Sequence, residues 1–100
     1  GTGEGLVSPE RQKQRMASMT STVPPNSPAR AYALGFGVSD GWIGHTGELP
    51  GFNTSIQFDP RTRTTVVVMV NSDIAGVNAA GMGVDPAPTI SGELIAAVVG

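Results

Sequence analysis

The chain has 100 residues, of which only 14% are charged, and its formal net charge is −2. This sparse and slightly acidic charge argues against nucleic acid and anionic membranes as partners, because both need dense Lys and Arg. The sequence has no apolar run of the roughly 18 residues that span a membrane, and no cysteine for a disulfide, a thiolate zinc site or a nucleophile.

The first expected element is a short polar helix that follows Ser8. The Ser8 hydroxyl can cap free amide groups, Pro9 suits the first helical position, and Glu10 favours the positive end of the helix dipole. We expect this helix to end near Ser18. Residues 20–28 hold three prolines and are expected to form a loop or linker.

The middle of the chain predicts antiparallel strands. Residues 32–38 alternate large and small side chains, which predicts a strand with Tyr32, Leu34, Phe36 and Val38 on one face. Asp40-Gly41 favours a tight hairpin turn, because both residue types tolerate a left-handed backbone. Residues 42–45 are then expected to form the paired strand.

Two more strands are expected after a second turn at Pro50-Gly51. In the first of them Phe52, Ile56 and Phe58 alternate with Asn53, Ser55 and Gln57, which predicts a buried apolar face and a wetter face. A turn at residues 59–63 follows. Residues 64–70 are then apolar without alternation, which is typical of a central strand covered on both faces.

The last part of the chain predicts a loop and a helix. Residues 72–84 are rich in Gly and Ala, and Pro86 lies at an expected helix start. That helix is expected to carry Ile90, Leu94, Ala97 and Val98 on one face. The fold class is therefore α+β, with an antiparallel sheet of about four strands flanked by an N-terminal and a C-terminal helix. The segments are 1–28 (helix and Pro-rich linker), 29–71 (strands) and 72–100 (loop and helix).

This arrangement leaves apolar surface without a cover. A strand that is buried on both faces needs a layer on each side. The C-terminal helix can supply one layer, whereas the N-terminal helix is too polar to supply the other. We therefore expect the missing cover to come from further chain of the same protein or from a second copy.

The only histidine, His45, is the main candidate for chemistry. A lone histidine in a strand is most often a structural or surface residue. Its neighbours favour a functional role, because Gly44 and Gly47 are costly inside a strand and allow something to approach the backbone closely. Both interpretations stay open on the residues alone.

A family resemblance covers nearly the whole chain. Its motifs are Gly44-His45-Thr46-Gly47, then Pro50-Gly51-Phe52-Asn53, then Gln57-Phe58-Asp59-Pro60 and the Val-rich strand. Together they resemble the C-terminal part of the penicillin-recognising serine hydrolases, nearest to D-alanyl-D-alanine carboxypeptidases, class C β-lactamases and related esterases. The resemblance implies a fragment of the β-lactamase/transpeptidase-like fold. A Lys-Thr-Gly form of the motif is typical of β-lactamases and penicillin-binding proteins, and the carboxypeptidase branch often has His at its first position.

The resemblance also implies a role for each motif residue. The strand would border the active-site cleft, with substrate lying along it as an added strand. His45 would take the place usually held by Lys and support electrostatics and proton movement around the nucleophile. The Thr46 hydroxyl would bind the substrate carboxylate or relay a proton, and Gly47 would leave room for the ligand. The backbone N–H of Glu48 would be one of two donors to the oxyanion.

The sequence departs from the family at the nucleophile. The family has a Ser-x-x-Lys motif and a Tyr-x-Asn type motif, whereas the only lysine here is Lys13, with Glu10 three residues before it. The only tyrosine, Tyr32, is followed by Ala33-Leu34. We therefore expect the isolated chain to be inactive, and the missing N-terminal part of the protein to carry the nucleophile.

Two functions remain on the sequence alone. The first is the C-terminal part of a serine hydrolase that acts on a D-alanyl-D-alanine peptide, a β-lactam or an ester through an acyl-enzyme. The second is a non-catalytic binding or interaction module that uses the same sheet. No cofactor is expected, and no metal site, since the aspartates lie at turns without a recurring ligand spacing. By resemblance, the setting is the cell envelope or the exterior of the cell.

Overall fold

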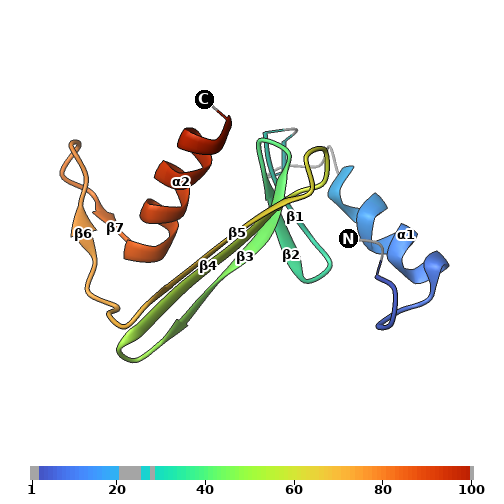
Figure 1. Cartoon of the computed structure of the whole chain (residues 1–100), viewed down its shortest axis with the longest axis horizontal. Coiled ribbons are helices and arrows are strands. Elements are labelled where there is room, and N and C mark those ends of the chain that lie inside the picture. The colour runs from blue at the N-terminus through green and yellow to red at the C-terminus, as the bar shows by residue number, and fades with distance from the viewer. Residues whose placement is uncertain (1–2, 21–25, 28, 100) are drawn as a thin grey trace.

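The computed structural model describes residues 3–20, 26–27 and 29–99. Its elements are α1 (Pro9–Ala17), the short 3-10 helix η1 (Ser18–Thr20), β1 (Arg30–Ala33), β2 (Phe36–Ser39), β3 (Trp42–Leu49), β4 (Phe52–Asp59), β5 (Thr64–Val70), β6 (Gly76–Val77), β7 (Gly83–Val84) and α2 (Pro86–Val99). Strands β1 to β5 form one antiparallel sheet in sequence order, with α1 before it and α2 after it (Figure 1). The predicted α+β class is confirmed. Most of the linker predicted at residues 20–28 lies outside the described residues.

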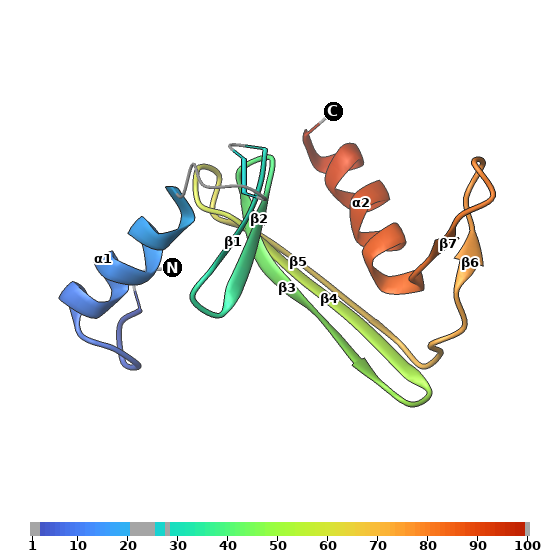
Figure 2. The same ribbon diagram turned by 180° about the vertical axis from the view of Figure 1, so that it is seen from behind.

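The polar helix α1 begins as predicted and is attached to the β1–β2 turn. The Ser8 hydroxyl accepts a hydrogen bond from the Arg11 backbone N–H at 3.3 Å. At the other end of the helix, the Arg15 Nε–H donates to the Leu34 carbonyl at 3.2 Å. The Arg15 guanidinium also lies over the Phe36 ring, 5.2 Å from its centroid. These contacts place α1 beside the β1–β2 hairpin and away from the long strands β3 to β5 (Figures 1 and 2).

The strand predicted at residues 32–38 is two strands, and that prediction was wrong. The chain reverses at Leu34-Gly35, so that Ala33 pairs with Phe36 and Tyr32 with Gly37. Gly35 has a φ of 81°, a left-handed conformation that glycine adopts readily. The alternation of large and small residues continues through the turn and therefore conceals it. The sheet has five strands in place of about four for this reason.

The other hairpin turns lie where the sequence predicts them. Asp40-Gly41 joins β2 to β3, and both residues have a positive φ, 48° and 85°. Pro50-Gly51 joins β3 to β4, with Gly51 at a φ of 83°. The segment 60–63 joins β4 to β5. The first two turns are determined by residue types that prefer the required backbone angles. In the third, Arg63 has a φ of 60°, a left-handed conformation that residues with a side chain rarely adopt.

The buried face of β4 is the polar one, contrary to the prediction. Asn53 and Ser55 are each 1% exposed, whereas Phe52 is 56% exposed. The Asn53 Oδ1 accepts a hydrogen bond of 2.8 Å from the Ala87 backbone N–H, in the first turn of α2. This bond satisfies an amide that has no partner within the helix. The helix therefore covers the face that can cap it, and the apolar face of β4 stays exposed.

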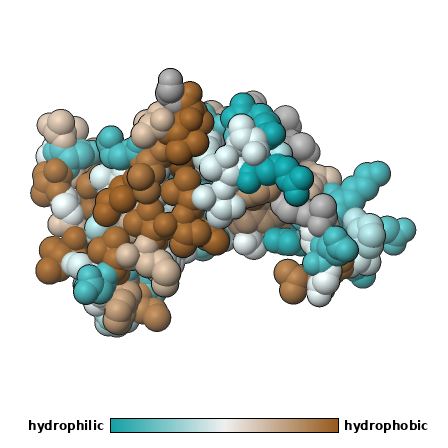
Figure 3. Space-filling model, in the orientation of Figure 1, coloured by the Kyte–Doolittle hydropathy of each residue, from teal (hydrophilic) through white to brown (hydrophobic). Residues whose placement is uncertain are grey.

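The helix α2 also packs on a different face from the predicted one. The side chains predicted to pack, Ile90, Leu94, Ala97 and Val98, are exposed. The buried positions are Ala87 and Ser91, and Ile95 packs beside Ala87 against a core of Trp42, Val66 and Val68. Small side chains let the helix backbone approach the sheet closely, which the apolar pattern alone does not reveal. Figure 3 shows the resulting apolar surface over α2.

Strand β5 has one covered face among the described residues. Val66 and Val68 lie under α2, whereas Val67 is exposed and Met69 is 79% exposed on the opposite face. The sequence predicts cover on both faces, and the described part of the chain supplies one. The segment 72–84, predicted as a loop, includes the short pair β6–β7.

A buried carboxylate anchors the β4–β5 turn. The Asp59 carboxylate accepts hydrogen bonds from the Arg61 Nε–H at 3.1 Å, the Arg61 backbone N–H at 2.9 Å and the Thr62 hydroxyl at 3.0 Å. The Arg61 side chain, with its backbone N–H and Thr62, holds the pKa of Asp59 below its ordinary value of 3.8 against the opposing effect of burial. The ionised form therefore stabilises the fold.

We expect the stability that Asp59 contributes to be present above pH 3.8 and lost as the pH falls through the lower folded-state pKa. Asp59→Asn should lower the melting temperature at neutral pH and reduce the further loss in acid. Thermal melts across the acid range measure both effects. Asp40→Asn is the matched control: it also removes a turn carboxylate, and Asn tolerates the positive φ at this position. An unchanged melting temperature in Asp59→Asn would contradict the prediction.

Candidate functional site

The motif strand β3 has an open edge beyond Gly44. On one side β3 pairs with β4 along residues 43–49. On the other side it pairs with β2 only over residues 42–44, and the last pair is Gly44 with Gly37. Among the described residues, no strand pairs with residues 45–49 on that side.

The register determines which backbone groups face this edge. The two-residue turn joins Leu49 directly to Phe52, so these residues form a hydrogen-bonded pair. Hydrogen-bonded and non-hydrogen-bonded pairs alternate along an antiparallel ladder. Thr46 and Glu48 therefore belong to the non-hydrogen-bonded pairs with β4. Their N–H and C=O groups point away from β4, toward the open edge, where they can pair with an added strand.

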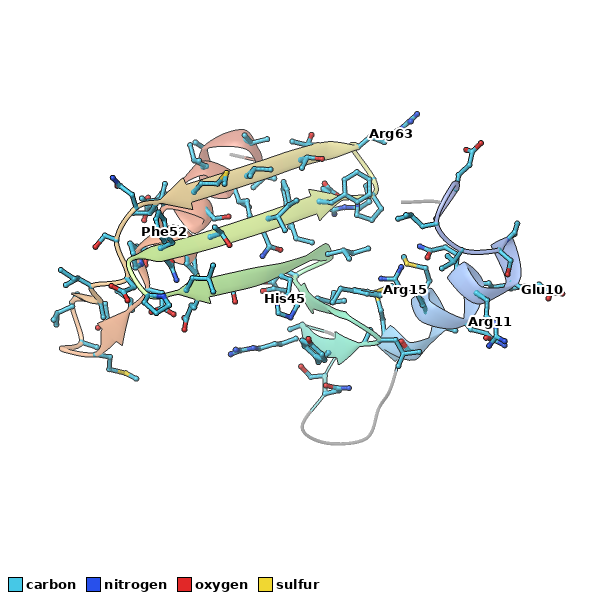
Figure 4. All side chains as sticks on the ribbon, turned by 90° about the horizontal axis from the view of Figure 1, so that it is seen from below. Glu10, Arg11, Arg15, His45, Phe52 and Arg63 are labelled. Atoms are coloured by element: carbon cyan, nitrogen blue, oxygen red, sulfur yellow. The ribbon has the colours of Figure 1, made fainter. Side chains whose placement is uncertain are left out.

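Both nitrogens of the His45 ring have hydrogen-bond partners. Nδ1 is hydrogen-bonded to the Thr46 carbonyl oxygen, which is one of the groups at the open edge. Nε2 lies 2.7 Å from the hydroxyl oxygen of Tyr32, on β1. The two aromatic rings meet edge to face, with centroids 5.7 Å apart and planes at 75°. Figure 4 shows His45 between β3 and the neighbouring hairpin.

A pocket of about 590 Å³ lies beside this ring. Its lining includes the His45 and Thr46 of the motif, together with Asn26, Arg30, Ala31, Tyr32, Gly37, Val38, Ser39, Gly44 and Gln57. All of them except Asn26, which precedes β1, come from β1, β2, β3 and β4, so the β1–β2 hairpin forms one wall and the motif strand the other. None of the residues that line it is acidic, and Arg30 supplies a positive charge. The pocket is therefore suited to an anionic or polar ligand.

The two motif glycines meet different neighbours. A Cβ atom on Gly44 would overlap the backbone carbonyl oxygen of Ile56 on β4. A Cβ atom on Gly47 would lie 2.6 Å from the Thr54 hydroxyl oxygen, a side-chain atom. Gly44 is thus required by the packing of two backbones. Gly47 is constrained only by a neighbouring side chain.

The Glu48 side chain lies away from the large pocket. It lines a separate hollow of about 290 Å³ with Asp73 and Asp85. A hydrogen bond with Asp85 and the charge of that carboxylate, followed by weaker contributions from burial and from Asp73, raise the pKa of Glu48 above its ordinary value. The Glu48 side chain thus lines the acidic hollow, whereas its backbone N–H and C=O face the open edge of β3.

The structure brings only part of the predicted site into one pocket. His45 and Thr46 line the large pocket, while Gly47 and Glu48 lie further along the same strand. Sequence reasoning missed Tyr32, Asn26 and Arg30. Their position depends on the reversal at residues 34–35, and the glycine there was the one signal of it.

In residues 3–20, 26–27 and 29–99, no group of three or more His, Asp or Glu side chains is placed to hold a metal ion. Over the same residues, no helix has both the length and the apolar character needed to span a membrane.

Comparison with known proteins gives one match. The family model described as Beta-lactamase matches residues 2–83. No curated protein and no solved structure matches the chain. The matched region includes α1, all five strands of the main sheet and the His45-Thr46-Gly47 motif on its open strand. The chain belongs to the beta-lactamase family, a family of serine hydrolase-like proteins.

Proposed function

We propose that this chain supplies the substrate-binding strand of a serine hydrolase of the D-alanyl-D-alanine carboxypeptidase, class C β-lactamase or esterase type. The observation that carries the proposal is the open edge of β3 at His45-Thr46-Gly47, which borders the large pocket. The family match supports the hydrolase class. The narrower assignment rests on the motif and on this geometry.

The open edge explains how a substrate would be held. The backbone groups of Thr46 and Glu48 face away from β4, so an extended peptide can add to β3 as a further strand. The Glu48 N–H would then donate to the carbonyl oxygen under attack, a contact whose loss typically costs about 3–4 kcal/mol of barrier. The Thr46 hydroxyl would bind the substrate carboxylate or relay a proton.

The pocket charge favours a substrate with a carboxylate. Arg30 lines the pocket on the hairpin side, and His45 and Thr46 line it on the β3 side. A guanidinium binds a carboxylate through two parallel hydrogen bonds, and no acidic residue in the lining competes for it. A terminal D-alanine or the carboxylate of a β-lactam has this chemistry.

The nucleophile would come from outside this sequence. In the proposed reaction a serine hydroxyl attacks the acyl carbon, its proton passes to the leaving amine or alkoxide, and water then hydrolyses the acyl-enzyme. The printed sequence has no Ser-x-x-Lys motif. The N-terminal part of the same protein, or a second copy, would complete the site, in the cell envelope or outside the cell.

The shape of the chain supports a missing partner. Its radius of gyration is 14.7 Å, compared with about 13 Å for a compact domain of 100 residues. Val67 and Met69 leave one face of β5 uncovered by the described residues, and Ile90 and Leu94 are exposed on α2. Apolar surface of this kind marks an interaction site.

A fluorescent penicillin tests the proposal, since it forms a covalent acyl-enzyme with this class of hydrolase. We expect no labelling of the 100-residue chain and clear labelling of the longer polypeptide that includes the preceding residues. The same polypeptide, denatured before the penicillin is added, is the control for non-specific attachment and should stay unlabelled. Labelling of the chain alone would show that it holds its own nucleophile. An unlabelled longer polypeptide that still binds a D-alanyl-D-alanine peptide would favour the non-catalytic binding module.

A further inference from the structure

In the described part of the chain, the His45 ring on β3 has one hydrogen-bond partner from another strand, the Tyr32 hydroxyl on β1. The Thr46 carbonyl oxygen can only accept a hydrogen bond, so the His45 Nδ1 bonded to it must carry a proton. In the neutral ring Nε2 is then an acceptor, and the Tyr32 hydroxyl, at 2.7 Å, donates to it. We propose that Tyr32 is a positioning residue that holds the orientation of the His45 ring, and that this orientation keeps the protonated Nδ1 on the Thr46 carbonyl. That this positioning of His45 serves catalysis rests on the proposed function.

Tyr32 is itself held from both sides. On the inner side of β1, Tyr32 pairs with Gly37 of β2. On the outer side of β1, the Asn26 side-chain amide binds the Tyr32 backbone twice. The Tyr32 N–H donates to Asn26 Oδ1 at 3.1 Å, and Asn26 Nδ2–H donates to the Tyr32 carbonyl at 3.4 Å. The Asn26 amide thus bonds to β1 as a neighbouring strand would. Because the Tyr32 backbone is held in place, its side chain can in turn hold the His45 ring in place.

The contact accommodates both charge states of the ring. When Nε2 takes up a proton, the Tyr32 hydroxyl can turn and accept the new N–H, because a hydroxyl both donates and accepts. The Nδ1–H stays on the Thr46 carbonyl in both states. Protonation therefore changes Nε2 without moving either ring. Nε2, which faces Tyr32 at the pocket, is the ring atom that exchanges a proton.

Nitrogen NMR tests this directly, because His45 is the only histidine of the chain. The full chain is labelled with 15N-histidine and measured well above the ordinary imidazole pKa of about 6.5. We expect a protonated Nδ1 and an unprotonated Nε2. Tyr32→Phe keeps the aromatic ring and removes the hydroxyl, so the His45 ring is free to turn and its Nδ1 to leave the Thr46 carbonyl. Both nitrogen signals should then move toward a tautomer mixture with a large Nε2–H fraction. Thr65→Val, a hydroxyl loss on β5, should leave both signals in place.

A proton on Nε2 in the unaltered chain would overturn the proposal, as would a Tyr32→Phe spectrum identical to the original. If Tyr32→Phe does not fold, Asn26→Ala takes its place, with a smaller shift in the same direction expected and an unchanged spectrum counting against the proposal. The measurement needs no nucleophile and no turnover. Failure of the longer polypeptide to be labelled by penicillin would therefore contradict the proposed hydrolase without affecting the NMR result. An NMR result against Tyr32 would likewise leave the proposed hydrolase untouched.

Discussion

His45→Ala should slow acylation of the complete enzyme by about 10²- to 10⁴-fold, the usual contribution of a positioned acid or base. The ring borders the pocket and makes hydrogen bonds at both nitrogens. In the proposed function, its removal takes away the proton carrier beside the open edge. The measurement is the rate of fluorescent penicillin attachment to the longer polypeptide under single-turnover conditions.

His45→Lys is the matched control for this prediction. Lysine stands at the first motif position in much of the family, so this variant should restore a large part of the acylation rate. Because His45 is exposed, neither variant should change the melting temperature greatly. A rate unchanged in His45→Ala would leave the ring with a structural role only.

Gly44→Ala should produce the largest loss of stability among the motif substitutions, roughly 3 kcal/mol. The added methyl group would overlap the Ile56 carbonyl oxygen, a backbone atom that a side-chain rotation cannot move. Relief would require β3 and β4 to separate at the centre of the sheet. Urea denaturation followed by circular dichroism gives the free energy of unfolding.

Gly47→Ala is the internal comparison, since it adds the same methyl group to the same strand. The nearest atom is the Thr54 hydroxyl oxygen at 2.6 Å, and this side chain can change rotamer. The stability loss should therefore be clearly smaller than for Gly44→Ala. Equal losses for the two variants would mean that the close approach of the Ile56 backbone does not control the strength of this strand pair.

Local features of the fold were predictable because neighbouring residues determine them. The cap at Ser8 and the turns at Asp40-Gly41 and Pro50-Gly51 depend on backbone angles and hydrogen bonds within four residues. The turn at Gly35 has the same local cause. It was missed because the alternation of large and small residues continues through it and imitates a single strand.

The choice of buried faces could not be predicted in the same way. Apolar patterns favoured Phe52 and Leu94 as buried side chains, yet both are exposed. Asn53 and Ala87, which meet across 34 residues of sequence, determine how α2 lies on the sheet. A hydrogen bond between distant residues leaves no periodic signal. The contact of Tyr32 with His45 was beyond prediction for the same reason.

The length of the β1–β2 hairpin has a consequence for ligand size. Because the pairing of β2 with β3 ends at Gly44, the turn at Leu34-Gly35 determines where the open edge begins. Two more residues in each arm of the hairpin would extend β2 along β3 and pair the backbone groups of Thr46. A shorter hairpin would expose more of β3. If substrate binds as the proposed added strand, the length of this hairpin sets how many of its residues can pair with β3, with no change in the motif.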